Sequence, residues 1–146
     1  MFPLTGGIAY ARSGEAAYAD ADFQRARGKA AEPVILNNMC WAKATAGVAL
    51  ESALADCNAA LAKAPDMAGY LDSRGLVLLR LGRIDDAIAD YDRALAKGPN
   101  IPSSLFGRAV AWARKGDRAK AESDAAAAAK IDPDIQADFE RYGVKP

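Results

Sequence analysis

Histidine is absent from this chain, and cysteine, methionine and tryptophan are scarce. The 146 residues include no His, two Cys, three Met and two Trp. The lack of His removes the commonest general base and the commonest metal ligand, and two cysteines alone are too few for a zinc site. No glycine-rich loop has the strand and lysine that a nucleotide site requires. The sequence therefore predicts a protein that is not an enzyme and holds no cofactor or metal.

An excess of charge of one sign is also missing, as are long apolar runs. Nineteen Lys and Arg residues balance nineteen Asp and Glu residues, which argues against a nucleic-acid partner. No stretch approaches the roughly 20 apolar residues of a membrane span, so direct membrane insertion is not expected. The first residues lack the basic and apolar regions of a signal peptide. This favours the cytoplasm, with the periplasm as the alternative if the chain is a processed fragment or carries a disulfide.

An internal repeat dominates what is present. Alanine recurs every 34 residues at positions 19, 53, 87 and 121. The same step joins Ala26, Ala60, Ala94 and Ala128, then Asp22, Asp56, Asp90 and Asp124, and also Pro65, Pro99 and Pro133. A small residue allows two helix backbones to approach closely where they cross. The repeat therefore predicts helices that cross at these alanines.

Residues 68–101 show the repeating unit most clearly. Apolar residues at helical spacing occupy both halves, Gly82 separates the halves, and Pro99 ends the second. One such hairpin leaves too much apolar surface exposed and needs neighbours on both sides. We expect helices at 4–13, 16–28, 34–46, 49–63, 68–81, 84–97, 102–115 and 118–130, and a further helix at 134–142.

The spacing of Leu71, Gly75, Leu78, Ala87, Tyr91, Ala94 and Pro99 resembles that of the tetratricopeptide repeat, as found in bacterial-type proteins of this family. The resemblance implies an all-α fold, a right-handed α-solenoid of about four helix hairpins. Residues 1–146 would form one domain with repeats at about 1–33, 34–67, 68–101 and 102–133. Residues 134–142 would form a capping helix over the last repeat, whereas the N-terminal end has no equivalent cap.

The resemblance also implies a non-enzymatic scaffold or adaptor that binds a protein or peptide segment in a concave groove. The groove would be lined by Asn38, Ala42, Thr45, Asp72, Leu76, Leu79, Arg80, Phe106, Val110 and Arg114. The lysines and asparagines with which some members bind a terminal carboxylate are not at the matching positions. The alternative is a structural or assembly module that contacts a larger protein, or a second copy of itself, through an uncapped N-terminal face formed by Phe2, Leu4 and Ile8.

The two cysteines lie at matching heights on one hairpin. Cys40 stands eight residues before the expected turn near Val48, and Cys57 stands nine after it. Two thiols facing each other can reach the separation of about 4.4–6.8 Å between α-carbons that a disulfide needs. Two interpretations stay open, a disulfide in an oxidising compartment or two buried free thiols in the cytoplasm.

Two arginines occupy a repeat position that is more often leucine in this family. Arg74 and Arg108 lie one repeat apart, next to the repeated aspartates of the second helices. A buried or half-buried guanidinium needs a carboxylate. We therefore expect Arg74 and Arg108 to pair with one or two of Asp56, Asp90 and Asp124.

Overall fold

The computed structural model describes residues 32–146, which form helices joined by short turns. The helices are α3 (Pro33–Ala46), α4 (Leu50–Lys63), α5 (Ala68–Arg80), α6 (Ile84–Lys97), α7 (Pro102–Lys115), α8 (Arg118–Ile131) and α9 (Ile135–Tyr142). Within residues 32–146 there is no β-strand. The bounds of these helices agree with the predicted ones to within one residue. The fold is an all-α solenoid.

Local sequence determines where the helices begin and end. Pro33 and Pro102 each stand in the first turn of a helix, where the missing amide hydrogen would have no partner in any case. Gly47, Gly116 and Gly143 end α3, α7 and α9 in the left-handed conformation, with φ between 70° and 89°. Glycine adopts this conformation without the steric cost that a β-carbon brings.

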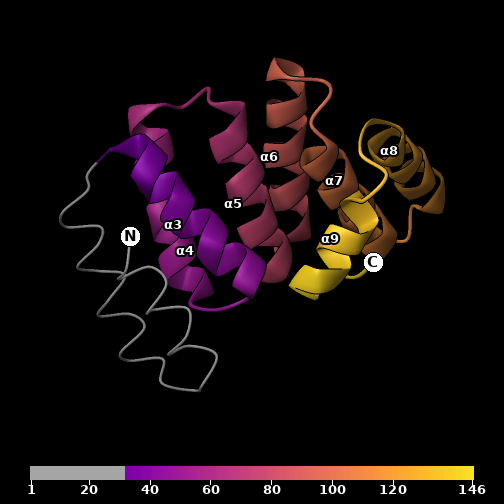
Figure 1. Cartoon of the computed structure of the whole chain (residues 1–146), viewed down its shortest axis with the longest axis horizontal. Coiled ribbons are helices and arrows are strands. Elements are labelled where there is room, and N and C mark those ends of the chain that lie inside the picture. The colour runs from indigo at the N-terminus through magenta and orange to yellow at the C-terminus, as the bar shows by residue number, and fades with distance from the viewer. Residues whose placement is uncertain (1–31) are drawn as a thin grey trace.

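Consecutive helices form three antiparallel hairpins, α3–α4, α5–α6 and α7–α8, and each hairpin packs against the next. Figure 1 shows the hairpins following one another along the long axis of the molecule, with α9 beside α7. The repeated alanines lie where helices cross, since Ala53, Ala87, Ala60 and Ala94 are fully buried. The prediction for the small positions is therefore confirmed within the described residues.

The largest buried cluster runs through all three hairpins and includes Ile135, Phe139 and Val144 from the C-terminal segment. Tyr91 on α6 is the largest fully buried side chain. Its ring fills the space that Gly75 on α5 and Gly107 on α7 leave open, because a β-carbon at either glycine would lie within 2.7 Å of the ring. Tyr91 thus joins the second hairpin to the third.

Candidate interaction surface

The two repeated arginines connect neighbouring hairpins. Arg74 donates from Nε and Nη2 to the carboxylate of Asp90 at 2.6 and 2.8 Å, and from Nη1 to Asn58 of the preceding hairpin at 3.2 Å. Arg108 repeats this arrangement with Asp124 at 2.7 and 2.9 Å and with Asp92 at 2.9 Å. The carboxylate of Asp124 raises the pKa of the Arg108 guanidinium. The predicted pairing is confirmed for Asp90 and Asp124.

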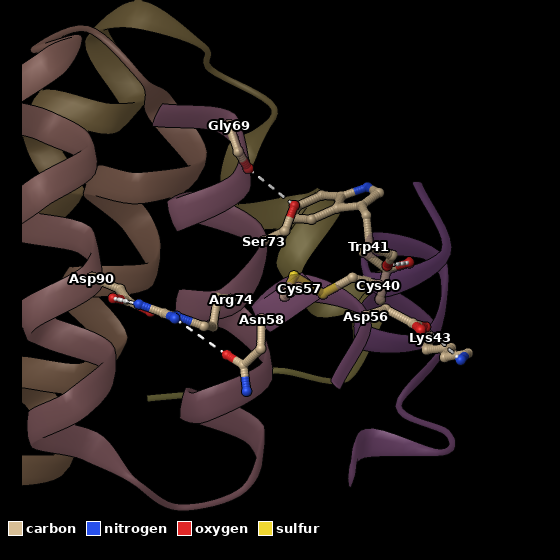
Figure 2. Close-up of a disulfide and its surroundings, with 11 residues drawn as sticks. Cys40, Trp41, Lys43, Asp56, Cys57, Asn58, Gly69, Ser73, Arg74 and Asp90 are labelled. Atoms are coloured by element: carbon tan, nitrogen blue, oxygen red, sulfur yellow. Dashed lines mark hydrogen bonds and ion pairs between the residues drawn. A yellow bond between two sulfur atoms is a disulfide. The ribbon is translucent and has the colours of Figure 1, made fainter. Parts of the chain in front are cut away.

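The first described hairpin departs from this pattern, because a cysteine stands at its arginine position. Cys40 on α3 is joined to Cys57 on α4, with 5.5 Å between their α-carbons (Figure 2). Both cysteines are fully buried. Asp56 receives a hydrogen bond from Lys43 Nζ at 2.6 Å, and both side chains of this ion pair are fully buried. A covalent bond and a lysine thus stand where the other hairpins use an arginine.

Helix α9 crosses the face formed by the first helices of the hairpins, α3, α5 and α7, which we call the inner face. The ring of Phe139 packs edge-on against Phe106 of α7, with 4.9 Å between centroids. One turn later Tyr142 reaches Trp41 of α3 with a centroid distance of 6.1 Å. Because a helix of eight residues touches both ends of the row, it lies across this face of the solenoid.

Two arginines on the inner face hold the end of α9 through main-chain atoms. Arg80 of α5 donates to the carbonyl oxygen of Tyr142 at 2.7 Å. Arg114 of α7 donates to the carbonyl of Lys145 at 2.7 and 3.1 Å and to that of Leu79 at 3.2 Å. The Arg80 guanidinium also lies over Gly47, where a β-carbon would come within 2.3 Å of it. These contacts do not depend on the side chains of the C-terminal segment.

The predicted groove is therefore covered rather than open. Leu76, Leu79, Phe106 and Val110 were expected to line an exposed groove, but all four are buried in one cluster with Phe139 and the other apolar residues of the C-terminal segment. Their assignment to a partner-binding groove stays a prediction, and in this structure α9 covers them. The physical reason is that α9 places its own apolar side chains on this face.

The remaining predicted groove residues differ in exposure. Asn38 and Arg114 are exposed, whereas Ala42, Thr45 and Arg80 are half-buried. The Thr45 hydroxyl donates to the main-chain carbonyls of Trp41 and Ala42 in its own helix. It is consequently engaged in local structure.

Asp72 is buried and accepts hydrogen bonds from the first turn of α7. It accepts hydrogen bonds from the hydroxyls of Ser103 at 2.8 Å and Ser104 at 2.6 Å, both in the first turn of that helix. A carboxylate at a helix N-terminus is favoured by the helix dipole. Burial nevertheless raises the pKa of Asp72, and the two hydroxyls oppose the rise. Asp72 thus links α5 to α7.

This raised pKa predicts how stability changes with pH. The folded state binds the proton of Asp72 more tightly than the unfolded state does, so the contribution is complete below the unfolded pKa and is lost as the pH rises through the folded pKa. We expect wild type to gain stability relative to Asp72→Asn as the pH falls from about 7 to about 4. Urea unfolding of both proteins measures this difference, with exposed Asp66→Asn as the control. A difference that does not change with pH would contradict the assignment.

One pattern in the sequence indicates the inner-face contacts, although it was not among the predictions above. Trp41 occupies a position that is small in the other hairpins, Gly75 and Ala109. Phe139 and Tyr142 stand three residues apart and so share one face of α9. A large aromatic residue at a usually small position, with an aromatic pair near the other end of the chain, is typical of a contact distant in sequence.

The end of the solenoid beyond α7 and α8 retains a cleft of about 440 Å³. Its walls include Phe106, Ala109 and Ala113 of α7 and Ala121 and Ala125 of α8. The helix predicted at 134–142 was expected to cover this apolar end. Helix α9 forms, but it is directed across the inner face and leaves the cleft between the two terminal helices. Helix α9 nevertheless contacts both α7 and α8, and its role as a cap on the last repeat stays a prediction.

Several predictions concern residues outside the described range. Phe2, Leu4 and Ile8, the proposed N-terminal interface, lie there, as do the first repeat and Ala19. Among residues 32–146, no group of three or more His, Cys, Asp or Glu side chains is placed to hold a metal ion. No helix in that part of the chain combines the length and apolar character needed to cross a membrane.

Comparison with known proteins supports the repeat assignment. A tetratricopeptide-repeat family model matches residues 73–134. No curated protein sequence matches the chain significantly.

Solved structures with the same fold are more numerous. A structure described as MamA MSR-1 is 20% identical, with a TM-score of 0.66, and the match covers 90% of this chain and 75% of that one. A thermophilic tetratricopeptide-repeat protein of Thermus thermophilus is 21% identical with a TM-score of 0.70, covering 96% and 79%. Another such protein, from Parabacteroides merdae, is 18% identical with a TM-score of 0.64, covering 97% and 57%. The chain thus shares the fold of these solved structures, and its residues 73–134 match the tetratricopeptide-repeat model.

Proposed function

We propose that this protein is a non-enzymatic scaffold that binds a segment of a partner protein on its inner face. Stacked helical repeats offer extended surfaces of this kind for protein binding. The observation that carries the proposal is that the inner face already holds a helical segment, α9, through aromatic contacts at Phe106 and Trp41. A surface that accepts one amphipathic helix fits the helix-in-groove mode of recognition.

The test must use residues that are exposed, because charges at Leu76 or Phe106 would enter the core and unfold the chain. Arg114→Glu reverses a charge on the inner face, and Lys130→Glu reverses an exposed charge on α8. We expect immobilised Arg114→Glu to lose partners that wild type and Lys130→Glu capture from an extract of the source cells. Asn38→Glu, an exposed change on α3, provides a second variant of the inner face.

Equal capture by all four proteins would contradict binding on the inner face. Thermal unfolding of Asn38→Glu and Lys130→Glu should match wild type, so that a loss of partners reports on the surface. Arg114→Glu also loses the hydrogen bonds to Lys145 and Leu79, so its result is compared with that of Asn38→Glu. Loss of partners with Lys130→Glu alone would place the binding surface on the second helices.

A further inference from the structure

Helix α9 holds the inner face with a small set of apolar groups. Phe139 is buried at 1% exposure and Ile135 at 5%, while Gln136, Glu140 and Arg141 on the other side of the helix are exposed. The helix follows Pro133, after the three hairpins. The hairpins contact one another directly through α3 to α8, so these contacts do not include α9.

Arg80 and Arg114, which bind the end of α9, differ from Arg74 and Arg108 in their hydrogen-bond acceptors. Arg74 and Arg108 each bind a carboxylate through two nitrogens. Among residues 32–146, by contrast, no carboxylate lies within ion-pair distance of Arg80 or Arg114. Their acceptors are neutral main-chain carbonyls. Burial and the nearby charge of Arg114 both lower the pKa of Arg80, so the two guanidinium groups repel each other.

We infer that α9 is an intramolecular substitute for the partner, and that the partner is an aromatic amphipathic helix whose end carries a carboxylate that pairs with Arg80 and Arg114. The inference rests on the proposed function and adds to it the class of partner and a self-occupied resting state. The partner's two aromatic residues, three positions apart, take the places of Phe139 and Tyr142. Its carboxylate takes the place of the Tyr142 carbonyl, and α9 leaves the face.

The charge explains why the partner can displace a segment that has the advantage of being tethered. A hydrogen bond to an ionised acceptor is roughly twice as strong as one to a neutral carbonyl. The partner carboxylate also screens the repulsion between Arg80 and Arg114, which α9 does not. The tether, in turn, disfavours displacement of α9 by helices that lack the carboxylate.

A peptide copied from the chain itself tests the inference. Residues 132–142 are synthesised once with a free C-terminal carboxylate after Tyr142 and once with an amide. Binding to the whole protein is followed by the fluorescence of Trp41 in a Trp112→Phe background. We expect the acid to bind about tenfold more tightly than the amide, because its carboxylate forms charge-assisted bonds. Arg114→Gln should bring the two affinities close together.

Weakening α9 should have the opposite effect on affinity. Tyr142→Ala removes the contact with Trp41, and Phe139→Ala removes the contact with Phe106. Both variants should bind the acid peptide more tightly than wild type, by about tenfold, because a larger fraction of the protein has a free inner face. Glu140→Ala, on the exposed side of α9, is the matched control and should bind as wild type does. Tyr142→Ala leaves the buried Phe139 in place, so it serves if Phe139→Ala does not fold.

Hydrogen exchange of the amides of residues 135–142 distinguishes displacement of α9 from binding on the inner face without displacement. Faster exchange there when the acid peptide binds supports displacement of α9. Peptide binding with unchanged exchange, or equal affinity of acid and amide, overturns the inference and leaves the proposed function standing. Absence of binding to wild type and to both weakened variants overturns the inner face as a site for helical segments, and the inference with it.

Discussion

Replacement of Tyr91 by alanine is expected to lower the free energy of unfolding by about 4 kcal/mol, as for other large buried aromatic side chains. Tyr91 is fully buried and contacts both Gly75 and Gly107, so its removal leaves a cavity between the second and third hairpins. Urea unfolding followed by circular dichroism measures the change. A loss below about 1 kcal/mol, typical of a surface substitution, would contradict this placement of the ring.

A second substitution makes the test specific. In wild type, Gly107→Ala places a β-carbon 2.4 Å from the Tyr91 ring, and overpacking of this kind costs about 1–3 kcal/mol. In the Tyr91→Ala background the same methyl group enters the cavity and also raises helix propensity. We therefore expect Gly107→Ala to destabilise the first protein and stabilise the second. The same sign in both backgrounds would show that the two residues are not in contact.

Loss of the bond between Cys40 and Cys57 is expected to cost about 3 kcal/mol, from the entropy of closing a loop of this size. The two residues are 17 positions apart and bridge α3 to α4 in the hairpin that α9 reaches through Trp41. Urea unfolding of oxidised wild type and of Cys40→Ala/Cys57→Ala measures the difference. Dithiothreitol should destabilise wild type by a similar amount.

The double variant is its own control, since dithiothreitol should leave its unfolding curve unchanged. If two thiols react with a thiol reagent in unfolded protein that has never been reduced, the bond is absent in solution. In that case the variant should differ from wild type only by the packing of two small side chains.

Residue spacing was sufficient to predict the helices and their pairing, for reasons visible at particular positions. A close helix crossing requires a small residue, which alanine at 53 and 87 supplies. Glycine or proline stands at or just after the end of each described helix, where the chain must leave the helical conformation. Arg74 and Arg108 require carboxylate partners, and the repeat places an aspartate at the same sequence distance from each. Each of these requirements is local or recurs with the 34-residue period, so one sequence is enough to recognise it.

The path of α9 could not be predicted in the same way. Its spacing fixes an amphipathic helix but not which apolar surface receives it, and both the cleft beside Ala121 and the inner face beside Phe106 are apolar. The choice depends on Trp41, about a hundred residues earlier in the chain. The hydrogen bonds of Asp72 could not be predicted either, because only the folded chain brings Ser103 and Ser104 to its carboxylate.

The arginine that reaches both its own hairpin and the preceding one has a consequence for chain length. If residues 68–101 were duplicated in tandem, the new copy of Arg74 would meet its own copy of Asp90 and, in the preceding hairpin, Asp92. That is the arrangement that Arg108 already has. Each such repeat thus carries the arginine that binds the preceding repeat. Whole repeats can therefore be added to the array without a new kind of contact between neighbours.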